Sequence, residues 1–181
     1  PVLGHEDAGE VGVALEGDAE HVEHLALHGL GARVHLEEGG HQRVRLGKLH
    51  TQAEALAAAA AQGETCTVAN DNDPSQVVIS GHKGAIDRAI ELVKDHGIKR
   101  GILLQVSAPF HCPLMQPAAD QMAAALAQTA INAPFVPVFA NILAAPVSEP
   151  DEIRKLLVEQ VTGRVRWRES AIAMRDARVS N

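Results

Sequence analysis

The chain has 181 residues, and 46% of them are hydrophobic, which is enough to bury the core of one ordinary domain. The formal net charge of −7 at pH 7 disfavours nucleic acid and anionic membrane surfaces as partners. No apolar run reaches the roughly 18 residues that a membrane-spanning helix needs, and the first residues lack the pattern of a signal peptide. We therefore expect a cytoplasmic protein.

The two cysteines, Cys66 and Cys112, are too few for a disulfide-stabilised scaffold. Zinc-finger spacing is also absent from the sequence. We expect both residues to be reduced thiols.

Residues 1–50 have an unusual composition for a folded core. They contain seven of the ten histidines and nine of the fifteen glycines, but no Phe, Trp, Tyr, Ser or Cys. Glycine recurs every few residues and interrupts any helix drawn through this segment. We assign no secondary structure here and treat residues 1–50 as a separate, atypical segment.

Five elements are predicted between residues 51 and 106 from helix propensity, apolar periodicity and turn residues. They are a helix over 52–62, strands over 66–69 and 76–80 joined by a turn at 70–75, an amphipathic helix over 82–96 and a strand over 101–106. The order α-β-β-α-β lacks only the first strand of a ferredoxin-like unit. We expect that strand just upstream of Thr51, and an α/β fold.

The remaining residues predict alternating helix and strand. An alanine-rich helix is expected over 114–130, an apolar strand over 135–140, a helix opened by proline and acids over 150–161, and a last helix over 165–177.

His111 is the first candidate for chemistry. It follows a predicted strand directly, on a loop that Pro109 restrains. A histidine at the carboxyl end of a strand in an α/β chain is well placed to act as a general base. The alternative is a histidine that only caps the following helix.

Two long blocks, residues 69–81 (ANDNDPSQVVISG) and 106–120 (VSAPFHCPLMQPAAD), closely resemble malonyl-CoA:acyl carrier protein transacylase. Shorter blocks at 134–138, 157–161 and 165–170 continue the resemblance in the same order to about residue 177. The resemblance implies an incomplete ferredoxin-like small subdomain over 51–106. It also implies the C-terminal part of an α/β-hydrolase-like acyltransferase core over 107–181.

The implied function is malonyl transfer from malonyl-CoA to the phosphopantetheine thiol of acyl carrier protein, in fatty acid biosynthesis. In that reaction a serine is acylated and deacylated in turn, with malonyl-CoA as substrate and no cofactor or metal. His111 falls on the family's catalytic histidine and would relay the serine proton. Gln160 falls on a glutamine expected to orient the histidine or the surrounding network, although it could also be a solvent-facing helix residue.

Three further residues are candidates for substrate binding. Phe110 falls where the wider family selects malonyl over bulkier acyl units, and a core phenylalanine is equally compatible. Asn70 and Asn72 could contact the acyl or pantetheine chain, but turn formation accounts for them better. Cys112 lies beside the histidine and is not expected to be a nucleophile.

The resemblance does not extend to the family's nucleophile. The family carries it in a Gly-His-Ser-x-Gly-Glu turn upstream of the small subdomain, whereas the first serine of this sequence is Ser75. The family's malonyl-binding arginine also has no match. Either residues 1–50 are read in a wrong frame or a rearrangement precedes a catalytic half, and the abrupt change near Thr51 favours the first. We expect the 181 residues as written to be inactive.

Two alternatives belong to other functional classes. The chain could be a non-catalytic fragment that binds acyl carrier protein through a basic cluster, for which its acidic balance is unfavourable. The only candidates for that cluster are Lys94, Lys99, Arg100, Arg164, Arg166 and Arg168. It could also be a His-rich metal-binding protein, since His21, His24 and His28 would share one face if residues 18–30 were helical.

Overall fold

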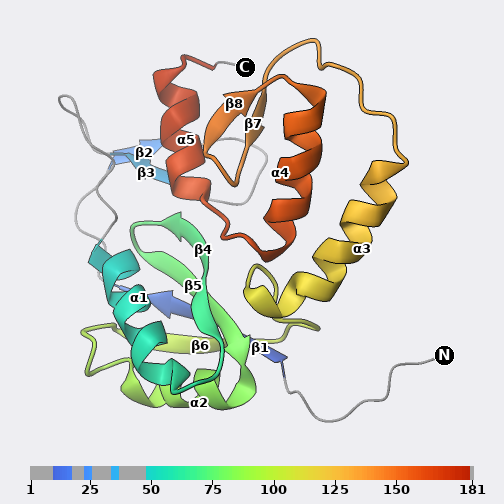
Figure 1. Ribbon diagram of the computed structural model, residues 1–181. Helices are drawn as coiled ribbons and strands as arrows, with labels where there is room; N and C mark the ends of the chain where they lie inside the picture. Colours follow the sequence, from blue (N-terminus) through green and yellow to red (C-terminus); the bar gives the residue numbers. More distant parts are fainter. Residues whose placement is uncertain (1–9, 18–22, 26–33, 37–47, 180–181) are drawn as a thin grey trace.

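A computed structural model describes residues 10–17, 23–25, 34–36 and 48–179 of the chain (Figure 1). The strands are β1 (Glu10–Glu16), β2 (Glu23–Leu25), β3 (Val34–Leu36), β4 (Cys66–Asp73), β5 (Gln76–His82), β6 (Arg100–Leu104), β7 (Val138–Ala140) and β8 (Ala145–Val147). The helices are α1 (Lys48–Ala61), α2 (Lys83–Leu92), the 3₁₀ turn η1 (Pro113–Met115), α3 (Gln116–Ala127), α4 (Pro150–Thr162) and α5 (Trp167–Asp176). The alternation of helices and strands confirms the predicted α/β class.

A four-stranded antiparallel sheet forms the first layer, with the strands in the order β4-β5-β1-β6. Helices α1 and α2 pack together on it and enclose one apolar core (Figure 1). Val13 and Leu15 of β1 and Val77 and Ile79 of β5 are fully buried in this core. The two-residue spacing within each strand points these side chains to the helix-covered face.

The first strand lies farther upstream than the sequence prediction placed it. It is Glu10–Glu16, not a segment next to Thr51, and α1 already begins at Lys48. The short β2–β3 hairpin lies between them in the chain. Weak alternation around Gly12 gave little strand signal, and only pairing with both β5 and β6 identifies this segment as a central strand.

The predicted turn at 70–75 is wrong in its first four residues. Strand β4 continues to Asp73, so the turn contains only Pro74 and Ser75. The Asp73 carboxylate accepts hydrogen bonds from the backbone N–H of Ser75 at 2.7 Å and from its hydroxyl at 2.6 Å. These bonds close a tight hairpin. Asn70 pairs with Val78 of β5, and Asn72 lies at an irregularity in the pairing between Asp71 and Asp73.

The second layer contains α3, α4, α5 and the β7–β8 hairpin (Figure 1). Helix α3 packs against α4, and α5 contacts β4 of the first layer. The predicted strand over 135–140 is shorter than expected, because Phe135 and Val136 precede β7 and are exposed. Within the described residues, no helix has the length and apolarity needed to cross a membrane.

Candidate functional site

The loop after β6 presents His111 in an uncommon backbone conformation. The φ angle of His111 is +58°, in the left-handed region that few residues other than glycine adopt. The neighbouring Cys112 is fully buried, and its thiol donates a hydrogen bond to the Pro109 carbonyl oxygen at 3.0 Å. Strained backbone of this kind persists only where surrounding contacts enforce it, and it is concentrated at functional sites.

The imidazole of His111 is held by one of its two ring nitrogens. Nδ1 lies 3.1 Å from the carbonyl oxygen of Gly163 and 3.4 Å from that of Gln160. Both partners can only accept, so Nδ1 must carry a proton and donate. Nε2 makes no hydrogen bond to any described residue and is the nitrogen that can accept a proton from a nucleophile.

Gln160 of α4 makes hydrogen bonds to groups that surround this histidine. Its Oε1 accepts a hydrogen bond from Asn141 Nδ2 at 2.5 Å, and its Nε2 donates to the Gly163 carbonyl oxygen at 3.3 Å. Nε2 also lies 3.4 Å from His111 Nδ1, but both atoms are donors, so that contact is not a hydrogen bond. Gln160 is therefore not a purely solvent-facing residue, and it reaches His111 through its own carbonyl and that of Gly163.

Gly163 ends α4 in a position where no larger residue fits. A Cβ atom there would lie 2.2 Å from Ile142 Cδ1 and 2.8 Å from the Glu159 carbonyl oxygen. The Gly163 N–H donates to that same Glu159 oxygen at 2.9 Å. This close packing fixes the carbonyl group that His111 uses.

The predicted substrate-binding residues do not all gather around His111. Phe110 is adjacent in sequence, and 44% of its surface is exposed. Asn70 lies on β4 beside Val165, and Asn72 Nδ2 donates to Gln76 Oε1 across the hairpin at 3.0 Å. Neither asparagine contacts His111, but β4 runs alongside the segment that follows Gly163.

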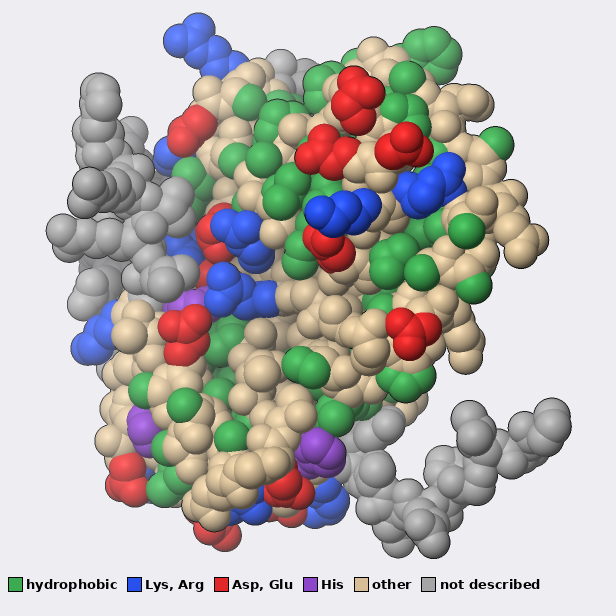
Figure 2. Space-filling model, in the orientation of Figure 1, with side chains coloured by type: hydrophobic (Ala, Val, Ile, Leu, Met, Phe, Trp, Pro, Cys, Tyr) green, Lys and Arg blue, Asp and Glu red, His purple; other side chains and the backbone are tan. Residues whose placement is uncertain are grey.

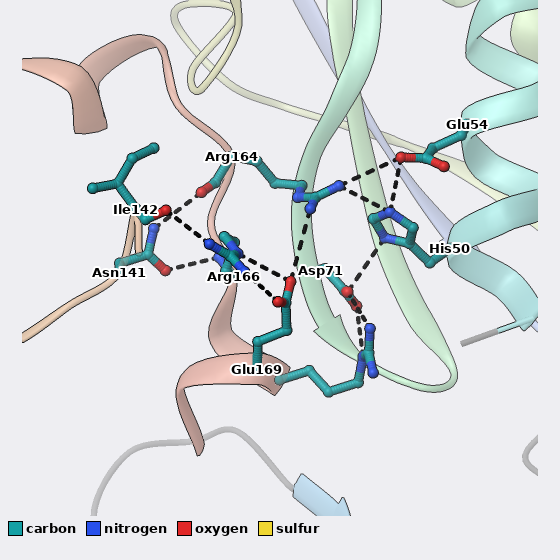
Figure 3. Close-up of polar contacts among 9 residues, drawn as sticks. His50, Glu54, Asp71, Asn141, Ile142, Arg164, Arg166 and Glu169 are labelled. Carbon is teal, nitrogen blue, oxygen red and sulfur yellow. Dashed lines mark hydrogen bonds and ion pairs between the residues drawn. The ribbon is translucent and has the colours of Figure 1, made fainter. Parts of the chain in front are cut away.

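A second polar cluster joins α1 and β4 to the segment before α5 (Figure 3). His50, which is only 1% exposed, lies with Nε2 3.0 Å from Glu54 Oε1 and 2.9 Å from a terminal nitrogen of Arg164. Its Nδ1 is 3.3 Å from Asp71 Oδ2, an ion-pair distance without hydrogen-bond geometry. A residue of the atypical segment is thus part of the buried interior.

Asp71 and Arg168 form a buried two-point ion pair. Arg168 Nε donates to Asp71 Oδ1 at 3.0 Å and a terminal nitrogen donates to Oδ2 at 2.5 Å. Burial by itself would raise the pKa of Asp71, but the adjacent His50 and the hydrogen bonds and charge of Arg168 lower it to about 2. The pair connects β4 to α5.

Arg166 completes the cluster at the start of α5. It donates to both carboxylate oxygens of Glu169 and, at 2.9 Å, to the carbonyl oxygen of Ile142 (Figure 3). The hydrogen bond from Arg166 lowers the pKa of Glu169 despite partial burial. Arg164, Arg166 and Arg168 are therefore engaged within the chain, and Arg100 pairs with Glu16, so at least four of the six basic residues considered above have partners in the chain itself.

The thiols and the proposed metal site offer little chemistry. Burial raises the pKa of Cys66 to about 11, although Arg88 opposes the shift, so the thiol stays protonated at neutral pH. His21 and His28 lie outside the described residues, and His24 is on a strand rather than the helix that the metal hypothesis requires. Among the described residues, no group of three or more His, Cys, Asp or Glu could hold a metal ion.

Sequence reasoning did not identify Asn141, Gly163 or the partners of Asp71. Asn141 offered one usable signal, because a polar amide directly follows an apolar strand, where α/β proteins place functional groups. Gly163 and Arg168 gave none, since their roles depend on neighbours distant in the sequence.

Comparison with known proteins assigns the family. The acyl transferase domain family matches residues 9–178. The chain belongs to this family. The acyl transferase match begins far upstream of Thr51, so it includes most of the segment that the sequence prediction left outside the resemblance.

Similar proteins in this family have the name that the resemblance suggested. The "Malonyl CoA-acyl carrier protein transacylase" of Haemophilus influenzae is 44% identical over 115 residues, which are 64% of this chain and 37% of that protein. An acyl-carrier-protein-S-malonyltransferase structure from Bartonella henselae matches with a TM-score of 0.72 and 37% identity, covering 93% of this chain and 44% of that one. The resemblance is confirmed, and the chain spans little more than a third of the length of the curated relatives.

A third match is a complex. The structure of a malonyl-transacylase with its type II PKS acyl-carrier protein matches with a TM-score of 0.75 and 27% identity, covering 97% of this chain and 47% of that one. An acyl transferase domain of similar fold is thus known to bind a carrier protein.

Proposed function

We propose that this chain supplies the histidine-bearing part of a malonyl-CoA:acyl carrier protein transacylase, with the role in fatty acid biosynthesis that the resemblance implies. The observation that carries the proposal is the geometry of His111. Its Nδ1 donates to a fixed backbone carbonyl at 3.1 Å, while Nε2 has no partner among the described residues. Family membership and the names of the similar proteins support the same reaction.

In the proposed reaction His111 moves one proton back and forth. Nε2 accepts the proton of a serine hydroxyl as the serine oxygen attacks the malonyl thioester carbonyl. The proton then passes to the departing coenzyme A sulfur, which leaves malonyl esterified to the serine. The phosphopantetheine thiol of acyl carrier protein attacks this ester, gives its proton to His111, and the serine oxygen recovers that proton on leaving.

The Gly163 carbonyl holds the ring in position and stabilises the cation that forms when Nε2 is protonated. Gln160 supports this acceptor by donating to it at 3.3 Å. The proposal assigns Phe110 to the acyl group and Asn70 and Asn72 to the substrate-facing side of β4. The reaction needs only a nucleophile, a base and the thioester, so we propose malonyl-CoA and acyl carrier protein as partners and no cofactor.

We assign the layers as a ferredoxin-like small subdomain and part of an α/β-hydrolase-like core. The strand order β4-β5-β1-β6, with both helices on one face, supports the first assignment. The proposed boundary near residue 106 coincides with the end of β6 and the start of the His111 loop. The nucleophile would be a serine that has no match among these 181 residues.

The test is reconstitution with radiolabelled malonyl-CoA. The chain is co-expressed with the segment of the Haemophilus influenzae relative that precedes the matched residues, and transfer to acyl carrier protein is measured. We expect no labelled protein from the chain alone and transfer from the pair. His111→Ala in the pair should lower transfer by roughly 10³-fold or more.

His96→Ala is the matched control, because this half-buried histidine lies on the connection between α2 and β6, away from Gly163. It should leave transfer unchanged. Full transfer by the His111→Ala pair, or covalent malonyl on the isolated chain, would refute the proposal.

A further inference from the structure

The side chain of Asn141 makes three hydrogen bonds that join the elements around the Gly163 carbonyl, and Figure 3 shows the two to the backbone of Arg164 and Arg166. Asn141 directly follows β7 and is half-buried. Its Nδ2 donates to Gln160 Oε1 at 2.5 Å and to the Arg164 carbonyl oxygen at 3.0 Å, and its Oδ1 accepts from the Arg166 backbone N–H at 2.8 Å.

The orientation of this amide is determined by backbone groups. The Arg166 N–H can only donate and the Arg164 carbonyl can only accept, so the Oδ1 and Nδ2 positions of Asn141 are unambiguous. Because Nδ2 faces Gln160, the Gln160 atom that receives the bond must be Oε1. The Gln160 Nε2 group is then directed to the Gly163 carbonyl oxygen.

Gly163 is therefore fixed from both sides. Before it, Gln160 is oriented by Asn141, and after it, the backbone of Arg164 and Arg166 is bound to the same amide. The Gly163 carbonyl oxygen between them is the acceptor 3.1 Å from His111 Nδ1. Asn141 itself does not touch His111.

We propose that Asn141 is a positioning residue that sets the tautomer of His111. By fixing the Gly163 carbonyl, it keeps the neutral ring protonated on Nδ1 and leaves Nε2 free to accept a proton. The consequence for acyl transfer rests on the proposed function above, whereas the tautomer itself does not.

A purely structural role would give a different result. Arg166 is also bound through its side chain to Ile142 and Glu169, so the segment has other attachments. If Asn141 only tied this turn together, its replacement would lower stability and leave the protonated nitrogen of His111 unchanged.

The test is long-range ¹H–¹⁵N NMR of the neutral histidine rings of the 181-residue chain. Asn141→Leu removes all three hydrogen bonds at nearly constant size, and Asn141→Ser keeps one hydrogen-bonding group. We expect the wild-type ring to be protonated on Nδ1. The ratio of Nδ1–H to Nε2–H should fall about fivefold or more in Asn141→Leu and less in Asn141→Ser.

Asn132→Leu is the control, because Asn132 is exposed and precedes β7 on the connection from α3. It should not change the ratio. A wild-type ring protonated mainly on Nε2 would overturn the proposal without any variant, even if Asn141→Leu fails to fold. An unchanged ratio in a folded Asn141→Leu protein would also overturn it.

The two proposals can be told apart. An unchanged tautomer ratio in a folded Asn141→Leu protein contradicts the role of Asn141 alone, and transfer that is insensitive to His111→Ala contradicts the proposed function alone. A wild-type ring protonated mainly on Nε2 would contradict both.

Discussion

The two layers of the molecule bury apolar surface very differently. In the sheet layer, 15 hydrophobic residues between Val13 and Ile98 form one buried cluster. In the layer after residue 106, the buried cluster has only Ala171, with Trp167 and Ile172 packed against it. Among the described residues, the exposed large hydrophobic side chains all lie at residue 102 or later, on β6 or after it. Figure 2 shows hydrophobic side chains at the surface over α3 and the connection toward β7.

The two layers therefore differ in what they contain: the first has the larger apolar core, and the second carries the candidate site. The sheet layer has its own apolar core. The second layer carries His111, Gln160 and Asn141 and has a smaller buried apolar cluster. The buried pair of Asp71 and Arg168 joins β4 of the first layer to α5 of the second.

Removing the carboxylate of Asp71 should have the largest effect on the link between the layers. Asp71→Ala takes the two-point partner from a guanidinium that is 5% exposed, and such a change costs about 3–5 kcal/mol. Urea unfolding measures the loss. Asp87→Ala at the exposed pair with Lys83 is the matched control and should cost less than about 1 kcal/mol. Equal losses would mean that the buried pair does not join the layers.

A leucine truncation in each layer tests the contrast in apolar burial. Leu56→Ala in α1 creates a cavity at a fully buried side chain and should cost about 2–5 kcal/mol. Leu157→Ala in α4 is the same chemical change at a side chain that is 47% exposed, and it should cost less than about 1 kcal/mol. Thermal unfolding of the two variants measures these losses of stability. Similar values would show that the second layer has a core of its own.

Acid should weaken the link between the layers in a defined pH range. The pKa of Asp71 in the folded state, about 2, lies below the ordinary aspartate value of 3.8, so the carboxylate stabilises the folded state fully above about pH 4. That contribution, about 2 kcal/mol, should be lost as the pH falls from about 4 through about 2. The difference in unfolding free energy between wild type and Asp71→Asn measures it. A difference that stays constant over this range would contradict the assignment.

Much of the fold after residue 51 follows from local sequence. The alanine-rich pattern of α1, the apolar periodicity of α2 and the Pro-Asp-Glu start of α4 predicted these helices, because propensity and capping act over a few residues. Strand β1 was missed because it forms through pairing with β5 and β6, which are 60 or more residues away in the sequence. No local pattern encodes such pairing.

The candidate site likewise contains residues that the sequence predicted and residues whose roles depend on distant neighbours. His111 was predicted from its place after a strand and from the resemblance, and the structure brings Gln160 next to it. Gly163 acts through its backbone carbonyl, for which the sequence has no signature, and Asn141 had only the signal of a polar amide directly after an apolar strand. The asparagines of β4 were expected in a turn, but the turn has only two residues and is closed by hydrogen bonds that Ser75 donates to the Asp73 carboxylate.

The smallest effect on stability is expected at Phe135. Its side chain is fully exposed in the segment before β7, so Phe135→Ser removes no packed contact and should change the unfolding free energy by less than about 0.5 kcal/mol. It should nevertheless reduce binding of the dye ANS to the folded chain, because an exposed aromatic side chain contributes apolar surface. Fluorescence titration and urea unfolding give the two readouts. A large loss of stability with unchanged dye binding would show that Phe135 is packed in solution, and the contrast between the layers would then be wrong at its most exposed point.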